Sequence, residues 1–185
     1  MNPSIIIETE RLIIREHVLS DAPFFFELNS NYNVVKYTGD VAFNNLEEAE
    51  NIVRYVMNQY KENGYGRWLV AEKETKNPIG WCGLKFHTDT KETDIGYRLL
   101  ESAWGKGYAT ESAKACIDYG FKHFHLNHIV GNARIQGMQQ LGHGRRLLGV
   151  EHHAHFHIRP LHRERAQHFE AAHMGTEQQH AARGV

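Results

Sequence analysis

The sequence contains little cysteine and no long apolar run. Its two cysteines, Cys82 and Cys116, lie far apart and form no CxxC pair, which argues against a disulfide framework and against a zinc site built on thiolates. We interpret both as reduced, buried packing residues. No segment approaches the roughly 20 apolar residues that a membrane helix needs, and the first residues lack the regions of a secretory signal. We therefore expect a cytoplasmic protein with no membrane partner.

A surplus of charge of one sign is also lacking. The formal net charge is −1 over 185 residues, and the pI is about 6.9. Without a basic surplus we expect no nucleic-acid partner, and any contact with a phosphate must be local. Hydrophobic residues make up 41% of the chain, which is enough to bury the core of one domain of this length.

The first half of the chain begins with strand character and continues with two helical patterns. Residues 5–16 have the composition of an opening strand or hairpin. Ser20 is the predicted cap of a first helix, with Asp21 and Pro23 in its first turn. A capping box at residues 45–48 predicts a second helix, whose apolar residues recur at helical spacing until Gly64.

The period then changes to that of short strands. Residues 67–72, 78–86 and 92–100 are predicted strands, residues 109–124 a long amphipathic helix, and residues 128–135 a further strand. A strand, a crossover helix and a strand imply one locally parallel pair in an otherwise antiparallel sheet. The predicted fold class is α+β, an α/β/α sandwich with a mixed, mostly antiparallel sheet flanked by helices.

A glycine-rich turn separates the strand at 92–100 from the long helix. Its sequence over residues 104–111 is Trp-Gly-Lys-Gly-Tyr-Ala-Thr-Glu. Gly105 and Gly107 allow successive backbone N–H groups to point at one anion beside the positive end of the helix. Lys106 adds a charge, and small Ala109 lets a bulky ligand approach. A merely tight strand-to-helix connection is the alternative, because two glycines alone do not define a ligand site. The phosphate-loop pattern GxxxxGK[ST] and the dinucleotide pattern GxGxxG are both absent, so a nucleotide-triphosphate loop and a dinucleotide site are set aside.

This turn resembles the acetyl-CoA loop of the GNAT superfamily of N-acetyltransferases, Gln/Arg-x-x-Gly-x-Gly/Ala. Gly107 and Ala109 match its two small positions, whereas Trp104 replaces Gln or Arg. The run at residues 104–111 and the early Glu-Thr-Glu-Arg-Leu at residues 8–12 are similar to the branch that contains the ribosomal-protein-alanine N-acetyltransferases. Because the resemblance covers roughly residues 5–136, we predict a GNAT-like acetyl-CoA-binding domain over residues 1–136 and an atypical tail over residues 137–185.

The resemblance implies a fold, a donor and a set of site residues. The sheet has a V-shaped splay between the fourth and fifth predicted strands, and acetyl-CoA is the acetyl donor. The acetyl group passes directly to a primary amine, either a protein N-terminus or a small molecule, and a homodimer is left open. The implied cofactor-binding residues pair with the pantetheine arm or hold the pyrophosphate: Leu99, Leu100, Trp104, Gly105, Lys106, Gly107, Tyr108, Ala109 and Thr110.

The resemblance also points to a general base. Asp94 lies on the fourth predicted strand just before the splay, where relatives often carry an acid, and it could accept the amine proton through water. A solvated strand residue is the alternative interpretation of Asp94, and Glu92 and Glu101 are weaker substitutes. Glu111 is expected in the first helical turn, where a negative charge favours the positive end of the helix.

The tail departs from the family pattern. No Lys follows Lys122 and no Tyr follows Tyr119, while nine of the 14 histidines lie between His143 and His180. The usual Asn-x-x-Ser helix and the tyrosine general acid are therefore missing. This loss supports three expectations: an unpaired far edge of the sheet, a catalytically impaired acyl-CoA-binding remnant as the alternative function, and a tail translated out of frame from an ancestral gene.

Alternate histidines in the tail raise the hypothesis of a metal site. On a strand, such residues share one face and could bind zinc or nickel; they are His152, His153, His155 and His157. Compositional bias is the better explanation, because no organised Cys or carboxylate partners accompany them. We predict no specific metal site.

Overall fold

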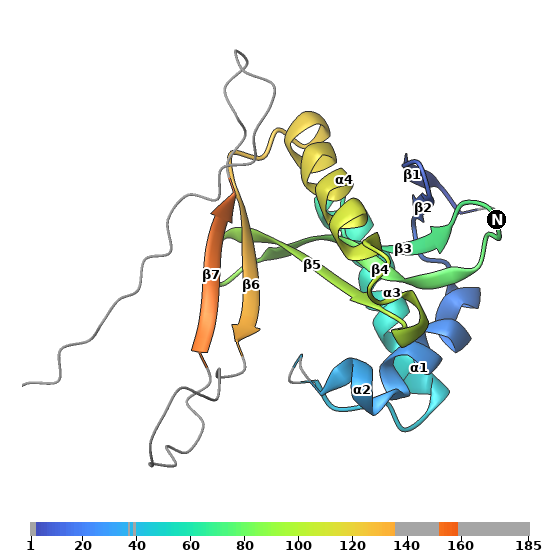
Figure 1. Ribbon diagram of the computed structural model, residues 1–185. Coiled ribbons are helices and arrows are strands. Elements are labelled where there is room, and N and C mark those ends of the chain that lie inside the picture. The colour runs from blue at the N-terminus through green and yellow to red at the C-terminus, as the bar shows by residue number, and fades with distance from the viewer. Residues whose placement is uncertain (1–2, 37, 39, 136–151, 159–185) are drawn as a thin grey trace, which may run out of the picture.

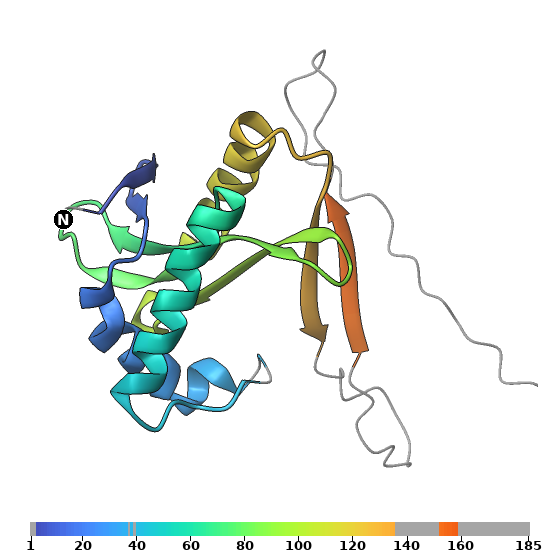
Figure 2. The same ribbon diagram turned by 180° about the vertical axis from the view of Figure 1, so that it is seen from behind.

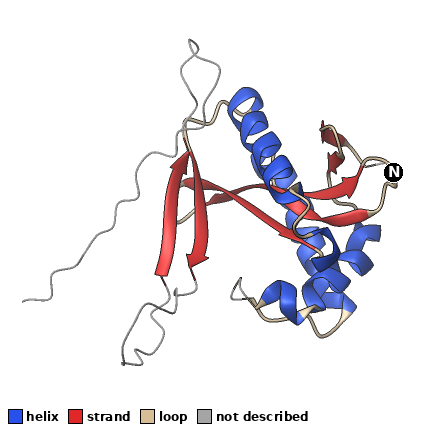
Figure 3. Ribbon diagram, in the orientation of Figure 1, coloured by secondary structure: helices blue, strands red, loops and turns tan. Residues whose placement is uncertain are grey.

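The computed structural model describes residues 3–36, 38, 40–135 and 152–158. Its centre is one sheet in which the strands follow one another in chain order (Figures 1 and 3). The strands are β1 (Ile5–Glu8), β2 (Leu12–Arg15), β3 (Arg67–Glu72), β4 (Pro78–His87), β5 (Glu92–Leu99), β6 (Ile129–Ile135) and β7 (His152–Ile158).

Helices cover both faces of this sheet. They are α1 (Ala22–Ser30), α2 (Tyr32–Val35), α3 (Leu46–Asn63) and α4 (Tyr108–His123), with short 3-10 turns η1 (Leu19–Asp21) and η2 (Glu101–Ala103). α4 lies in front of the sheet in Figure 1 and α3 lies in front in Figure 2, which is seen from behind. This three-layer arrangement confirms the predicted α+β sandwich. No helix in the described part of the chain combines the length and apolar character needed to cross a membrane.

The helix boundaries follow local capping signals, with one correction. The Asn45 side chain accepts a hydrogen bond from the Glu48 N–H at 3.0 Å, and Gly64 ends α3 in the left-handed conformation, as predicted. The predicted cap at Ser20 was wrong. The chain first makes η1, and α1 begins after Asp21, whose carboxylate accepts a hydrogen bond from the Val18 N–H at 2.8 Å.

The pairing of β5 with β6 is short and parallel. Asp94 pairs with Val130 and Ile95 with Gly131, and β5 then continues to Leu99 without further pairing to β6. All other neighbouring strands are antiparallel. The two strands diverge in Figure 1, so the predicted V-shaped splay between these strands is confirmed.

The expected unpaired edge at β6 was wrong. β7, which belongs to the atypical tail, pairs with β6 in antiparallel register from Ile129↔Ile158 to Ile135↔His152. Any backbone that is extended can form such a ladder, whatever the composition of its side chains. The hypothesis of a histidine metal site concerns side chains that lie outside the described residues, as does the rest of the tail.

The main core lies between the sheet and α4. Its largest buried side chain is Trp68 on β3, whose ring meets the Tyr119 ring edge-on at 6.0 Å. Cys82 and Cys116 are buried in this core as free thiols, as the sequence predicts. A second cluster on the opposite face joins α1 and α3 to β4 through Phe25, Val53 and Trp81. The sheet is therefore held from both sides beside the splay.

Candidate active site

The glycine-rich turn leads directly from the end of β5 into α4. Gly105 has φ of +73° and Gly107 has φ of +80°, a conformation that residues with a side chain rarely adopt. A Cβ at Gly105 would meet no atom within 4 Å, and one at Gly107 would meet only Arg11 Nη2 at 3.5 Å. The turn thus leaves open space in front of the first N–H groups of a 16-residue helix, where the helix dipole favours an anion.

The end of β5 offers main-chain groups to the splay. The Leu100 N–H donates to Ile79 O at 2.9 Å, beyond the Gly80↔Leu99 pair. Gly80 and Leu99 therefore form a non-hydrogen-bonded pair of the antiparallel ladder, in which the main-chain groups of each residue point away from the partner strand. The N–H and C=O of Leu99 thus point away from β4, and so do those of Tyr97, two residues earlier. Leu100 differs, because its C=O also accepts a hydrogen bond from Ala103 N–H at 2.9 Å. Of the two predicted pantetheine partners, Leu99 has its main-chain groups directed away from β4, whereas both main-chain groups of Leu100 are hydrogen-bonded within the chain.

Trp104 braces the turn against β5. Its indole Nε1 donates to Leu99 O at 2.8 Å, while 46% of its surface remains exposed. The predicted residues Lys106 and Thr110 are exposed, and Tyr108 and Ala109 are partly buried at the start of α4. All the predicted pyrophosphate residues therefore cluster on one surface at the positive end of this helix.

Asp94 lies at the apex of the splay, where β5 last pairs with β6. Its Oδ1 accepts a hydrogen bond from Arg67 Nη2 at 2.7 Å, and His87 Nε2 lies 3.3 Å away. The Asp94 side chain is only 12% exposed. Gly96 makes this pair possible, because a Cβ there would lie 2.8 Å from the Arg67 guanidinium carbon. Asp94 is thus a buried, ion-paired carboxylate rather than a solvated strand residue.

A second arginine on β5 ties the strand to the helices on the α1 face. Arg98 donates to the Asn29 side chain on α1 and to Thr38 Oγ1 at 2.9 Å, and it forms an ion pair with Asp40. Its guanidinium also lies over the Trp81 ring, 5.5 Å from the centroid. Sequence analysis did not find this cluster, because nothing local relates a strand residue to partners about 60 residues earlier.

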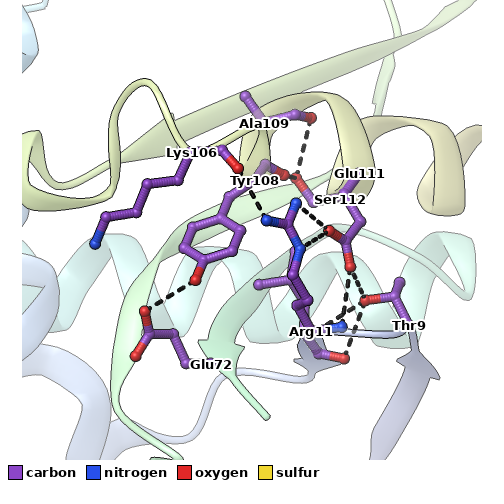
Figure 4. Close-up of polar contacts among 9 residues, drawn as sticks. Thr9, Arg11, Glu72, Lys106, Tyr108, Ala109, Glu111 and Ser112 are labelled. Atoms are coloured by element: carbon purple, nitrogen blue, oxygen red, sulfur yellow. Dashed lines mark hydrogen bonds and ion pairs between the residues drawn. The ribbon is translucent and has the colours of Figure 1, made fainter. Parts of the chain in front are cut away.

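A third arginine, Arg11, joins the β1–β2 turn to the glycine-rich turn (Figure 4). Its Nε donates to Glu111 Oε2 at 2.7 Å, and its Nη1 donates to Lys106 O at 3.0 Å. Thr9 Oγ1 donates to Glu111 Oε1 at 2.6 Å. Glu111 lies in the first turn of α4, as predicted. The sequence pattern at residues 8–12 had indicated only a family resemblance, and its contact with the turn emerges from the fold.

The Glu111 carboxylate is held in its charged form by these partners. Desolvation raises the pKa of Glu111, but hydrogen bonds from Thr9 and Arg11 and the positive charge of Arg11 outweigh it. The net result is a pKa below the ordinary value. The network therefore keeps a full negative charge beneath the Arg11 guanidinium at neutral pH.

Two observations bear on the kind of ligand that the described residues could hold. In the ranges that the structure covers, no group of three or more His, Cys, Asp or Glu side chains is placed to hold a metal ion. The combination of an open glycine turn, a helix N-terminus and a splayed strand edge suits a ligand that carries phosphate at one end and amide groups along its arm.

Comparison with known proteins agrees with this geometry. Residues 11–136 match the family model described as the acetyltransferase (GNAT) domain. The chain belongs to the GNAT acetyltransferase family. The match ends at the residue where the composition of the chain changes.

Individual relatives of this GNAT chain are acetyltransferases. The uncharacterised N-acetyltransferase p20 of Bacillus licheniformis is 34% identical over 122 residues, which are 65% of this chain and 68% of that protein. Two solved structures share the fold. The spermidine N-acetyltransferase of Vibrio cholerae, in complex with CoA and spermine, has a TM-score of 0.63 at 17% identity, over 82% of this chain and 96% of that chain. The ribosomal-protein-S5-alanine acetyltransferase of Vibrio fischeri has a TM-score of 0.60 at 19% identity, over 71% and 75%.

Proposed function

We propose that this GNAT chain transfers an acetyl group from acetyl-CoA directly to a primary amine, in the cytoplasm. The pyrophosphate would lie on residues 104–110, and the pantetheine arm would pair with the main-chain edge of β5 near Leu99, where β5 is not paired with β6. The acceptor would be a protein N-terminus or a small amine. Residues 1–136 would form the catalytic domain, to which the tail adds β7.

One observation carries this proposal: the splay between β5 and β6 opens directly beside the N-terminus of α4. β5 pairs with β6 only at Asp94 and Ile95, so the strand beyond has an unpaired edge. Gly105 and Gly107, both with positive φ, bring no side chain into the turn at its end. An extended amide-containing arm can add to such an edge, and its phosphates then reach the positive helix end.

The chain would contribute positioning and proton removal. When bound, acetyl-CoA supplies an activated thioester that an amine can attack without a covalent enzyme intermediate. Holding both reactants in one cleft replaces a bimolecular encounter with an oriented attack. An α-amino group with a pKa of about 7.7 to 8.0 loses its proton more readily than a lysine near 10.4.

We propose Asp94 as the base, acting through water. Its place at the apex of the splay, with Arg67 and His87 beside its carboxylate, supports this role.

A second candidate is an acyl-CoA-binding remnant without turnover. It is favoured by one observation: no tyrosine follows Tyr119, so the usual proton donor to the departing thiolate is missing from the chain. This candidate keeps the pyrophosphate turn and predicts binding without product.

Thiol release from acetyl-CoA tests the proposal against a panel of amines. The panel contains an alanine-terminated peptide, spermidine and free amino acids, and at least one of them should release thiol above the hydrolysis background. Calorimetric binding of acetyl-CoA without release by any acceptor would favour the remnant instead.

The proposed role of Asp94 has its own test. Asp94→Asn should lower kcat by more than tenfold, because the amide cannot accept the proton. The Kd of acetyl-CoA should not change, and Glu101→Gln serves as the matched control. A kcat of Asp94→Asn within twofold of wild type would rule out Asp94 as the base, and thermal melting checks that each variant is folded.

A further inference from the structure

Arg11 contacts the glycine-rich turn from behind, on the side of the β1–β2 hairpin (Figure 4). Its guanidinium Nη1 donates to the main-chain oxygen of Lys106 at 3.0 Å. That oxygen belongs to the peptide between Lys106 and Gly107, in the middle of the turn. The guanidinium therefore fixes the orientation of one specific peptide group.

The orientation of this peptide decides where its N–H points. All peptide bonds in the described residues are trans, and in a trans peptide the C=O and the N–H point in opposite directions. Because Arg11 holds the Lys106 C=O, the Gly107 N–H must point away from Arg11, toward the open side of the turn.

Arg11 is itself held rigidly by its neighbours. Its Nε and Nη2 lie 2.7 and 2.6 Å from Glu111 Oε2, and its main-chain N–H donates to Glu111 Oε1 at 3.1 Å. The guanidinium lies over the Tyr108 ring, 4.7 Å from the centroid. On the hairpin, the Lys73 N–H donates to Arg11 O at 2.8 Å. A planar guanidinium group that several partners hold in place can fix the direction of the carbonyl group to which it donates.

We propose that Arg11 is a positioning residue for the CoA pyrophosphate: it holds the Lys106 carbonyl so that the Gly107 N–H faces the anion. This inference rests on the proposed function and adds a residue to it that touches no ligand. Without the guanidinium, the peptide can rotate about the ψ angle of Lys106 and the φ angle of Gly107, where a glycine leaves the backbone free. Rotation brings a carbonyl oxygen, which repels phosphate, to the place of an N–H.

The effect of losing Arg11 should differ between CoA and pantetheine. In this proposal the pyrophosphate of CoA contacts the Lys106–Gly107 peptide, whereas pantetheine has no pyrophosphate and contacts only β5. Loss of Arg11 should therefore weaken CoA binding about tenfold, the effect of one well-oriented hydrogen bond to a charged group. Pantetheine binding should be unchanged.

The experiment compares CoA with pantetheine on the full chain. Calorimetry gives the Kd of CoA, and ligand-detected NMR at millimolar concentration gives that of pantetheine, for wild type, Arg11→Gln and Arg11→Lys. Arg11→Lys keeps the charge but cannot contact Glu111 and Lys106 O with one fork, so it should lose most of the CoA affinity too. Arg54→Gln, on the exposed face of α3, is the matched control and should bind both ligands normally.

Three results would overturn the inference. An unchanged CoA Kd in Arg11→Gln, or an equal loss for CoA and pantetheine, would mean that Arg11 does not orient the turn. Full CoA affinity in Arg11→Lys would mean that charge alone suffices. Failure of the wild-type chain to bind CoA would instead overturn the proposed function, so the two failures are distinguishable. Thermal melting confirms that the variants are folded.

Discussion

The two faces of the sheet are built differently. Under α4 the sheet packs through apolar side chains such as Trp68, Leu84 and Ile117. The opposite face also contains buried apolar residues, but three arginines on it pair with carboxylates: Arg15 with Asp21, Arg67 with Asp94, and Arg98 with Asp40. Register explains the pattern, because Arg15 and Arg98 lie in one cross-strand row with Leu69 and Trp81.

This difference assigns separate tasks to the two faces. The apolar face fixes α4, and with it the turn that would bind the pyrophosphate. The charged face meets α1 and the segment around Thr38 and Asp40 through Arg98. Apolar packing gives a rigid support, whereas paired charges give directional contacts that depend on pH and on each partner.

The largest effect should come from the apolar face. Trp68→Ala should lower the free energy of unfolding by about 3–5 kcal/mol, since it removes a fully buried aromatic side chain and leaves a cavity under α4. Urea unfolding followed by far-ultraviolet circular dichroism measures it. Trp104→Ala, at a half-exposed position, is the control. An equal loss of unfolding free energy in both variants would contradict the assignment of Trp68 to the apolar core under α4.

Breaking a charged pair should cost somewhat less. Arg67→Met should lower the free energy of unfolding by about 2–4 kcal/mol, because it leaves the buried Asp94 carboxylate without its partner. The double variant Arg67→Met with Asp94→Leu should recover most of that loss, since no unpaired charge remains. Additive losses in the double variant would show that Arg67 acts through packing alone.

A pH-dependent effect should arise at His17, which is buried against Phe25 on the charged face. Burial lowers the pKa of His17 from 6.5 to about 4, an effect that Arg15 reinforces and Asp21 opposes. Between these values the unfolded state binds more protons. Stability should therefore be constant above pH 6.5 and fall as the pH drops toward 4, by up to about 3 kcal/mol.

Urea unfolding at pH 7, 6 and 5 measures this slope. His17→Leu should remove most of it while leaving stability at pH 7 within about 1 kcal/mol of wild type. A wild-type curve that is flat between pH 7 and 5 would show that His17 is accessible to protons in the folded state.

The sequence predicted features whose signals are local. The caps of α3 at Asn45 and Gly64, the turn at Gly105 and Gly107, and the strands β3 to β5 are encoded within a few residues. The four-residue helix α2 was missed because it is too short to show a period. β7 was missed because its sequence, His-His-Ala-His-Phe-His-Ile, carries little of the apolar alternation that marks a strand.

The residues around the site were less predictable than the turn itself. Glu111 contacts a hairpin 100 residues earlier, and Arg98 contacts Asn29, 69 residues earlier. Such contacts depend on how elements pack, which no local pattern specifies. The domain boundary near residue 136, the roles of the predicted site residues and the out-of-frame origin of the tail stay predictions. Translation of the other reading frames beyond codon 136 would test the last of these.

The most direct test of the account is calorimetric titration of the full chain with acetyl-CoA, beside a Gly107→Val variant. Valine cannot adopt a φ of +80° without strain, so the variant should lose the turn and with it at least a hundredfold in affinity, while melting at a similar temperature. Equal binding by the wild type and the variant, or no binding by a folded wild type, would contradict the assignment of the turn as the acetyl-CoA pyrophosphate site.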